Sequence, residues 1–226
     1  MEKIYSVAVD GPSGAGKSTM AKAAAAKLGI LYVDTGAIYR TIGYYIFKVG
    51  VDPKDNAAVI ARLPEITIDM AYSEDGLQHM FLGGEDVTTE IRLPEMSMYA
   101  SAVSAIPEVR EYLLEMQRDL ARKQSVIMDG RDIGTVVLPD AEVKIFLTAP
   151  VEVRAMRRLK ELQERGTETD FEAVLKDMQE RDYNDSHRAA APLKQADDAV
   201  LLDNGDMGFD ESLEAMLNII KERVSR

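Results

Sequence analysis

The sequence contains no cysteine among its 226 residues. The chain therefore has neither a disulfide framework nor a thiol for nucleophilic catalysis. It also lacks any apolar run that approaches the roughly 20 residues needed for a membrane-spanning helix. The first apolar segment begins at Ile4, which leaves no room for a signal peptide before it. We therefore expect a soluble protein of the cytoplasm.

Positive charge is scarce as well. The chain has 27 Lys and Arg against 39 Asp and Glu, a net charge of −12 and a sequence pI of about 4.7. This balance argues against broad binding to nucleic acids or membrane surfaces, which are themselves negatively charged. A composition that is 46% hydrophobic over this length is enough for one α/β domain with insertions. We expect a monomer whose partners are small molecules.

A glycine-rich segment, GPSGAGKS, occupies residues 11–18. It follows the apolar run Ile4–Val9 and opens an alanine-rich helical run, Lys17–Leu28. This is the pattern G-x4-G-K-[ST] in the order strand, loop, helix that a phosphate-binding P-loop requires. The match favours a nucleoside triphosphate site over a glycine-rich turn without a ligand. The fate of the terminal phosphate must be inferred from the rest of the chain.

The chemistry of this loop follows from its residue types. Glycines allow a left-handed backbone, so that successive N–H groups point inward and form a nest for an anion. The N-terminus of the new helix adds unpaired donors and the positive end of its dipole. Lys17 supplies a charge for the outer phosphates, and the Ser18 hydroxyl is placed to ligate Mg²⁺. The expected ATP-binding residues are Gly11, Pro12, Ser13, Gly14, Ala15, Gly16, Lys17, Ser18 and Thr19.

A second polar segment, DTGAIYR at residues 34–40, follows the short predicted strand Ile30–Val33. Ligands of open α/β sheets bind outside the carboxyl ends of the strands, where this segment lies. Asp34 or Thr35 can cap the helix that follows. Arg40 belongs either to a solvated helix face or to a second phosphate site beside the P-loop.

A hairpin pattern interrupts the βα units. Ile66–Tyr72 alternates in polarity, the turn SEDG follows at residues 73–76, and Leu77–Leu82 returns. We interpret residues 63–92 as an inserted β-rich subdomain, in which His79 is an ordinary hairpin residue. Residues 98–123 then predict two helical segments, the second starting at Pro107.

Carboxylates end two of the predicted strands. Ser125–Met128 leads to Asp129, and an acid at this point beside the P-loop strand usually supports Mg²⁺ through water. Asp10 ends the P-loop strand, where a carboxylate that accepts from the local backbone is favoured over a catalytic one. Arg131 and Asp132 follow Asp129, and they form either a local salt bridge or part of a site.

The segment VEVRAMRRLKELQERG, residues 151–166, predicts a helix that is dense in arginine. Its side chains are either solvated or part of a closing lid, in which guanidinium groups meet the charge on a transferring phosphoryl group. The arginines are Arg154, Arg157, Arg158 and Arg165. A further helix begins at about Phe171.

The segments GPSGAGKS and DTGAIYR resemble those of bacterial cytidylate kinases, members of the nucleoside monophosphate kinase group. Three further patterns of that family fit and extend the resemblance over most of the chain. They are A-S-x-V-S-x-x-P-x-V-R at residues 100–110, D-G-R-D-x-G-T-V-V at 129–137 and R-D-x-x-D-x-x-R-x-x-x-P-L at 181–193.

The resemblance implies a P-loop α/β fold with a five-stranded parallel sheet in the order 2-3-1-4-5, flanked by helices. The strands expected from the sequence are Ile4–Val9, Ile30–Val33, Ser125–Met128, Glu142–Leu147 and Asp198–Leu202, and an amphipathic helix from Asp210 closes the chain. The implied division is a core of residues 1–62, 107–150 and 171–226, a small β-rich acceptor-binding insert of residues 63–106, and an arginine-rich lid of residues 151–170. The implied reaction converts Mg–ATP and CMP or dCMP to ADP and CDP or dCDP.

The resemblance also implies roles for single residues. CMP would be bound by Thr35, Tyr39, Arg40, Ser101, Arg110, Arg131, Asp132, Arg181, Asp185 and Arg188. Within this set Ser101 and Arg110 contact cytosine, Asp185 bonds the sugar, and Asp132 accepts from the cytosine N4 amino group, where uracil presents a repelling carbonyl. The expected catalytic residues are Lys17, Arg131, Arg157, Arg158 and Arg188, with Arg157 also contacting ATP. Mg²⁺ would lie on Ser18 and, through water, on Asp129, while His187 matches no family role.

Three other kinds of protein remain as alternatives. A P-loop kinase could use a different small acceptor, such as UMP, shikimate or dephospho-coenzyme A. A GTPase-type switch would need the guanine-reading pattern N-K-x-D, which the sequence lacks, and a non-catalytic regulator would be expected to lack the arginine cluster. No general base is needed, because the acceptor is an ionised phosphate and catalysis consists of positioning and charge stabilisation.

Overall fold

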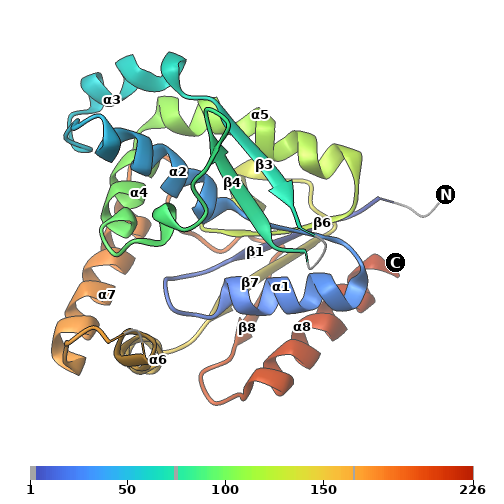
Figure 1. The fold of residues 1–226 in the computed structure, drawn as a ribbon. Helices are drawn as coiled ribbons and strands as arrows, with labels where there is room; N and C mark the ends of the chain where they lie inside the picture. The colour runs from blue at the N-terminus through green and yellow to red at the C-terminus, as the bar shows by residue number, and fades with distance from the viewer. Residues whose placement is uncertain (1–3, 74–75, 165, 226) are drawn as a thin grey trace.

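The computed structural model describes residues 4–73, 76–164 and 166–225. A five-stranded sheet lies at its centre in the order β2-β6-β1-β7-β8, and all of its pairings are parallel (Figure 1). Its strands are β1 (Ser6–Asp10), β2 (Leu31–Asp34), β6 (Val126–Gly130), β7 (Val143–Thr148) and β8 (Val200–Asp203). When the hairpin strands are set aside, this is the expected order 2-3-1-4-5. The predicted α/β fold is confirmed, with strand bounds shifted by one or two residues.

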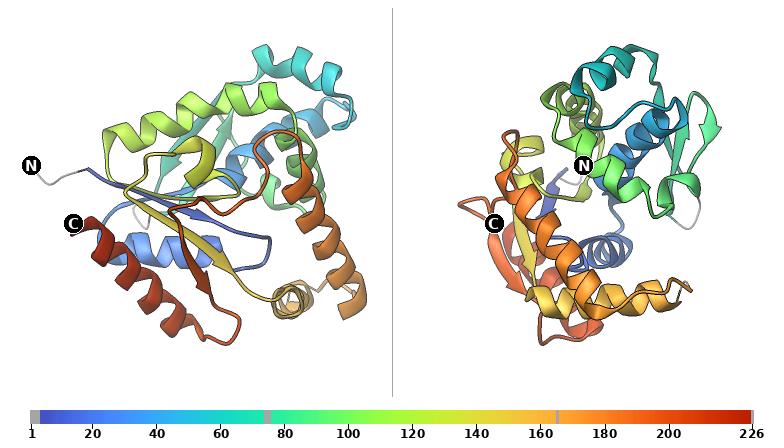
Figure 2. Two further views of the ribbon diagram at one scale, coloured as in Figure 1. Left: turned by 180° about the vertical axis from the view of Figure 1, so that it is seen from behind. Right: turned by 90° about the vertical axis from the view of Figure 1, so that its left-hand side faces the viewer.

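Helices cover both faces of this sheet (Figures 1 and 2). They are α1 (Lys17–Leu28), α2 (Thr35–Lys48), α3 (Asn56–Arg62), α4 (Met96–Ser104), α5 (Pro107–Lys123), α6 (Val151–Glu164), α7 (Phe171–His187) and α8 (Phe209–Val224). The fully buried side chains of β1 alternate between the two layers. Val7 and Val9 pack with α1 and α8, whereas Ala8 packs with α2 and α5. A parallel strand that is covered on both faces is apolar in its interior, and the central residues of β1, Val7, Ala8 and Val9, meet this requirement.

Local sequence signals set the helix ends. Helix α1 has the predicted bounds and ends at Gly29, whose φ of 66° is left-handed and whose N–H donates to the Ala25 carbonyl. Asp34 caps α2, since its side chain accepts from the N–H of Ala37 at 2.8 Å. Pro107 is the first residue of α5, as predicted.

The inserted hairpin is confirmed and carries one more strand than predicted. Its antiparallel strands are β3 (Ile68–Tyr72), β4 (Gln78–Leu82) and the short β5 (Glu85–Asp86). Residues 74–75 of the predicted turn lie outside the described residues. The Gln78 side chain accepts from the N–H of Asp34 at 2.8 Å and donates to its carbonyl at 3.2 Å. The insert is thereby tied to the point where β2 passes into α2.

Helices α6 and α7 form a unit of their own on the left of Figure 1. They pack on each other through a small apolar cluster centred on Ala155, Val174 and Met178. This apolar cluster is separate from the two larger clusters that cover the faces of the main sheet. Among the described residues, no helix has both the length and the apolar character that crossing a membrane requires.

Candidate functional site

A cavity of about 490 Å³ opens where β1, β2 and β6 end. It joins the P-loop to residues from α2, α4, α5, α6 and α7 that are distant in the sequence. The predicted site residues that line it are Ser13, Gly14, Gly16, Lys17, Ser18, Thr19, Thr35, Tyr39, Arg40, Ser101, Arg110, Asp129, Arg131, Asp132, Arg158, Arg181, Asp185 and Arg188. Both halves of the predicted site, for donor and for acceptor, therefore share one cavity.

The remaining predicted residues do not line this cavity: Gly11, Pro12, Ala15 and Arg157. Gly11 has a structural role, because a Cβ there would lie 1.9 Å from the carbonyl oxygen of Leu147 in β7. Arg157 lines a neighbouring cavity of about 350 Å³ together with Asn204 and Phe209. Its guanidinium donates to the Oδ1 atom and to the carbonyl of Asn204, at 3.1 and 2.8 Å.

The P-loop backbone has the predicted form. Gly14 and Gly16 are left-handed, with φ of 75° and 86°, and Gly16 caps α1. A Cβ on Gly14 would lie 2.6 Å from the methyl group of Met178 and 3.2 Å from the Cβ of Arg154. Glycine is therefore required here for two reasons, the backbone angle and the close approach of α6 and α7.

Lys17 is buried, and its Nζ atom donates to the Pro12 carbonyl at 2.8 Å, across the P-loop. Burial and the nearby charge of Arg131 lower the pKa of Lys17 well below its usual range. Such an ammonium group gains from a negatively charged ligand that replaces its lost hydration.

The buried carboxylate of Asp129 accepts two hydroxyl hydrogen bonds. Ser18 Oγ donates to Oδ2 at 2.9 Å, and the Tyr32 hydroxyl donates to Oδ1 at 2.8 Å. Burial, together with the neighbouring charge of Asp34, raises the pKa of Asp129. Tyr32 was not identified from the sequence, because nothing in the pattern of a short strand tells which side chain will meet a distant carboxylate.

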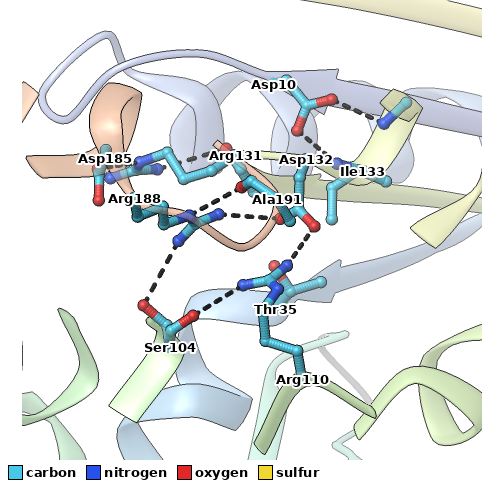
Figure 3. A network of polar contacts seen from close by, with 12 residues as sticks. Asp10, Thr35, Ser104, Arg110, Arg131, Asp132, Ile133, Asp185, Arg188 and Ala191 are labelled. Carbon is cyan, nitrogen blue, oxygen red and sulfur yellow. Dashed lines mark hydrogen bonds and ion pairs between the residues drawn. The ribbon is translucent and has the colours of Figure 1, made fainter. Parts of the chain in front are cut away.

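Several of the predicted acceptor residues meet around Asp132 (Figure 3). Its carboxylate pairs with Arg110 through Oδ2 and lies 3.4 Å from Arg188 Nη2 through Oδ1. Arg110 also donates to the Ser104 carbonyl at 3.1 Å and lies over the ring of Tyr39, 5.4 Å from its centroid. Asp132 and Arg110 are both buried. A buried carboxylate between guanidinium groups can read a polar edge of a ligand that enters the cavity.

Arg131 pairs with Asp185, not with its neighbour Asp132. Its Nε atom lies 2.7 Å from Asp185 Oδ2 (Figure 3). The alternative of a local salt bridge between residues 131 and 132 is therefore wrong. Burial acts to raise the pKa of Asp185, but the neighbouring arginines, chiefly Arg131, together outweigh this effect and hold that pKa below its usual value. Burial and the charge of Arg131 also lower the pKa of Arg181.

Two further predicted acceptor residues, Thr35 and Arg40, are placed by polar contacts. Thr35 Oγ1 donates to the Asp129 carbonyl at 2.6 Å, and Arg40 pairs with Asp34 at 2.9 Å. Arg40 therefore faces the cavity rather than a solvated helix surface. Ser101 lines the cavity from α4. His187 stacks on Tyr183 on the exposed side of α7.

The arginines of α6 differ in their surroundings. Arg158 lines the cavity and pairs with Glu161 at 2.8 Å. Arg154 fits neither of the expected alternatives, because it is buried and donates to the Ala149 carbonyl, the Ser13 carbonyl and Asp182 at 2.8, 2.9 and 2.7 Å. Arg165 lies outside the described residues.

Asp10 is also bonded differently from the prediction. It accepts from backbone N–H groups, as expected, but these belong to Ile133 and Gly134 and are not local.

Several cavity-lining residues were not singled out as site residues in the sequence: Asp34, Gly36, Arg92, Ser97, Ala100, Ser104, Gly130, Glu161, Asp177 and Met178. Most of them lie within or beside the motif segments. The sequence could have indicated them only if every residue of a motif segment had been counted as part of the site.

Comparison with known proteins gives a consistent result. A family model described as cytidylate kinase matches residues 7–222. A protein of Caldicellulosiruptor bescii named cytidylate kinase is 48% identical over 219 residues, which are 97% of this chain and 96% of that protein. One of Shouchella clausii with the same name is 48% identical over 222 residues, 98% of each. The structure of an uncharacterized protein from Eubacterium ventriosum aligns with a TM-score of 0.55 at 15% identity, covering 98% of this chain and all of that one, and supports the fold alone.

Proposed function

The chain belongs to the cytidylate kinase family of phosphotransferases, and we propose that the cavity described above transfers the γ-phosphate of Mg–ATP to CMP or dCMP. The observation that carries this proposal is the pairing of Asp132 with Arg110 and Arg188 in the same cavity as the P-loop. A P-loop alone would support any nucleotide-dependent reaction. A buried carboxylate opposite it supports an acceptor that presents an N–H donor, as cytosine does at N4.

On the donor side, the P-loop residues 11–19 hold the triphosphate through backbone N–H groups, and Lys17 exchanges the Pro12 carbonyl for phosphate oxygens. Arg157 faces the second cavity, which lies beside the P-loop and has room for the nucleoside part of ATP. Arg158 faces the first cavity, where the phosphoryl group would be transferred. These assignments agree with Lys17, Arg157 and Arg158 as catalytic or ATP-binding residues.

Mg²⁺ fits the group formed by Ser18 and Asp129, which offers a hydroxyl and a carboxylate oxygen 2.9 Å apart. The described part of the chain has no cluster of three or more His, Cys, Asp or Glu that could hold a metal ion. Mg²⁺ is usually bound by few protein ligands together with water and nucleotide phosphates, so a sparse site suits it. When bound, the ion neutralises charge on the phosphate oxygens.

On the acceptor side, Ser101, Arg110 and Asp132 would bind the base, and Asp185 would bind the sugar. The acceptor phosphate would be held by Arg131, Arg181 and Arg188, with Thr35, Tyr39 and Arg40 completing the site. The ion pair between Arg131 and Asp185 supports this division. When CMP binds, Arg131 would replace Asp185 with the acceptor phosphate, and Asp185 would replace Arg131 with a sugar hydroxyl. Catalysis then consists of holding two phosphates in line and stabilising their charge.

The same proposal includes the division of the chain. Residues 63–106 form the acceptor-binding insert, which the Gln78 contact to Asp34 ties to α2. Residues 151–170 form a lid, supported by the separate core of α6 and α7. We also propose a monomer in the cytoplasm, where ATP and CMP are present. The core comprises residues 1–62, 107–150 and 171–226.

A coupled assay of ADP formation with CMP, dCMP, UMP and AMP as acceptors tests the proposed function. CMP and dCMP should be used with a kcat/KM at least about tenfold above that for UMP and AMP, the factor expected for one unmatched polar contact. Preference for UMP, or activity only with shikimate or dephospho-coenzyme A, would contradict it.

A further inference from the structure

Asp10 is the last residue of β1 and lies directly before the P-loop. It is 4% exposed, and both of its carboxylate oxygens are used. Oδ1 accepts from the N–H of Ile133 and Oδ2 from the N–H of Gly134, each at 2.7 Å (Figure 3). A buried charge is costly unless it is hydrogen-bonded, and these two N–H groups supply its hydrogen bonds.

The two N–H groups that donate to Asp10 belong to the first two residues of a π-helical turn, Ile133–Val137. The first donors of any helical turn lack partners within it and need a cap. The usual cap is the side chain of the residue just before the turn, and aspartate is among the best residues for this purpose. Here that residue is Asp132, yet its side chain makes no capping hydrogen bond. Asp10, at the end of β1, caps the turn instead.

The carboxylate of Asp132 is therefore left to the cavity, where it meets Arg110 and Arg188. The backbone of Asp132 is fixed at the same time, because its carbonyl accepts from Val136 and Val137 at 2.9 and 3.2 Å. Without the Asp10 carboxylate, the uncapped N–H groups would compete for the side chain of Asp132.

We propose that Asp10 is a positioning residue for acceptor specificity: it caps the turn after Asp132 and so keeps the Asp132 carboxylate directed at the acceptor base. This inference rests on the proposed function, in which Asp132 reads cytosine. It also links the two halves of the site, because one residue ends the strand that carries the P-loop and positions the acceptor loop.

The test is the ratio of kcat/KM for CMP to that for UMP in Asp10→Asn. The asparagine side chain keeps the volume but can accept from only one of the two N–H groups. We expect kcat/KM for CMP to fall by about tenfold or more, the effect of losing a hydrogen bond to a charged group, while UMP changes by less than about threefold. The KM for ATP should be unchanged.

Glu142→Gln is the matched control. Glu142 accepts from the N–H and the hydroxyl of Ser6, at 2.9 and 3.2 Å, at the opposite end of β1. Like Asp10, Glu142 is a carboxylate that accepts a hydrogen bond from a backbone N–H group, but it does not line the cavity. Both acceptors should keep their kcat/KM in this variant. A fall that is equal for CMP and UMP in Asp10→Asn, or one confined to the KM for ATP, would show a merely structural role and overturn the proposal.

A double-mutant cycle separates this inference from the proposed function. If Asp10 acts through Asp132, Asp10→Asn should not change the CMP-to-UMP ratio any further in an Asp132→Asn background. An equal change in both backgrounds overturns the inference, as does a ratio that moves in Asp132→Asn but not in Asp10→Asn. If Asp132→Asn alone leaves the ratio unchanged, base reading by Asp132 fails and the inference fails with it. Asp10→Ser is measured in parallel, and failure of both Asp10 variants to fold also overturns the proposal.

Discussion

Arg154 donates from Nη1 to the backbone carbonyl of Ser13 over 2.9 Å, so helix α6 holds the tip of the P-loop. The same guanidinium pairs with Asp182 of α7 at 2.7 Å and donates to the Ala149 carbonyl at 2.8 Å. One buried side chain thus joins the P-loop, the start of α6 and α7. We therefore predict that movement of the proposed lid changes the shape of the P-loop through Arg154.

We predict that Arg154→Lys raises the KM for ATP by about tenfold, because an ammonium group cannot reproduce the planar set of donors that Arg154 uses. The KM for CMP should change much less, since Arg154 makes no contact with the acceptor residues. Steady-state kinetics with each substrate varied in turn measures both values. Arg122→Lys is the control, because Arg122 is an exposed arginine that pairs with Glu115 and Asp119 of its own helix, α5. Equal effects of the two variants would contradict the coupling.

Tyr32 supports a second prediction, because its hydroxyl donates to Asp129 at 2.8 Å opposite Ser18. Tyr32→Phe keeps the ring but removes this donor, so Asp129 loses one of the groups that orient it. Groups behind a metal ligand typically change metal affinity by about ten- to a hundredfold, and we expect the Mg²⁺ concentration for half-maximal activity to rise by about tenfold. Titration of Mg²⁺ at saturating ATP and CMP measures this.

Tyr45→Phe is the matched control for Tyr32→Phe. The Tyr45 hydroxyl also donates to a carboxylate, Glu65, at 2.6 Å, but this pair is exposed and lies away from the cavity. Its Mg²⁺ dependence should match that of the unmodified protein. If Tyr32→Phe behaves like Tyr45→Phe, Tyr32 does not orient Asp129 for the metal.

The sequence predicted the elements well because their signals are local. Short apolar runs, the glycines of the P-loop, Gly29 and Pro107 each act within a few residues, and the structure confirms their elements. The two-residue strand β5 and the π-helical turn at Ile133–Val137 were missed, since neither carries a periodic signal. Family motifs indicated most of the cavity lining.

Partners of buried polar groups were the least predictable feature. Asp10 was expected to bond the local backbone, and a local salt bridge was one of two alternatives for Asp132, yet the partners of both lie on other segments of the chain. Arg154 belongs to a helix whose arginines were expected to be solvated or free for phosphate, but it is buried. Which hydrogen bond a buried group makes depends on how distant elements pack, and no single-sequence pattern records that packing.

Asp10 also leads to a pH prediction. Burial raises its pKa from 3.8 to about 6, against the lowering effect of the N–H groups of Gly134 and Ile133, while Asp132 raises it further and Lys17 lowers it. Below pH 3.8 the group is protonated in both the folded and the unfolded protein. Between pH 3.8 and about 6, Asp10 is ionised in the unfolded protein but still protonated in the folded one, so the free energy of unfolding falls as the pH rises. Above about pH 6 Asp10 is ionised in both states, and the free energy of unfolding does not fall further on its account.

The measurement compares the unmodified protein with Asp10→Asn, which does not titrate at this position. The difference in their free energies of unfolding should shift against the unmodified protein by up to about 3 kcal/mol as the pH rises through this window, at about 1.4 kcal/mol per pKa unit. Urea unfolding at several pH values between about 4 and about 7 determines it. Other titrating groups are shared and cancel. A difference that does not vary with pH would show that the pKa of Asp10 is not raised.

Asp132 supports the most direct prediction about substrate choice. Its carboxylate can accept from the N4 amino group of cytosine but would repel the O4 carbonyl of uracil. In Asp132→Asn the amide can rotate its NH₂ group toward uracil O4 or its oxygen toward cytosine N4. We expect a large fall in kcat/KM for CMP and little or no fall for UMP, which moves their ratio by about one to two orders of magnitude, given about 1–3 kcal/mol per good base contact.

Asp185→Asn is the control for this experiment, because Asp185 pairs with Arg131 and is assigned to the sugar. Since CMP and UMP carry the same sugar, this variant should lower kcat/KM for both by the same factor. Both variants replace a carboxylate in one cavity, so a general loss of charge or stability would affect them alike. Only a group that faces the base can change the ratio of the two substrates. If Asp132→Asn leaves that ratio unchanged, or if Asp185→Asn changes it equally, Asp132 does not read the base, and the proposed basis of specificity fails while the kinase assignment stands.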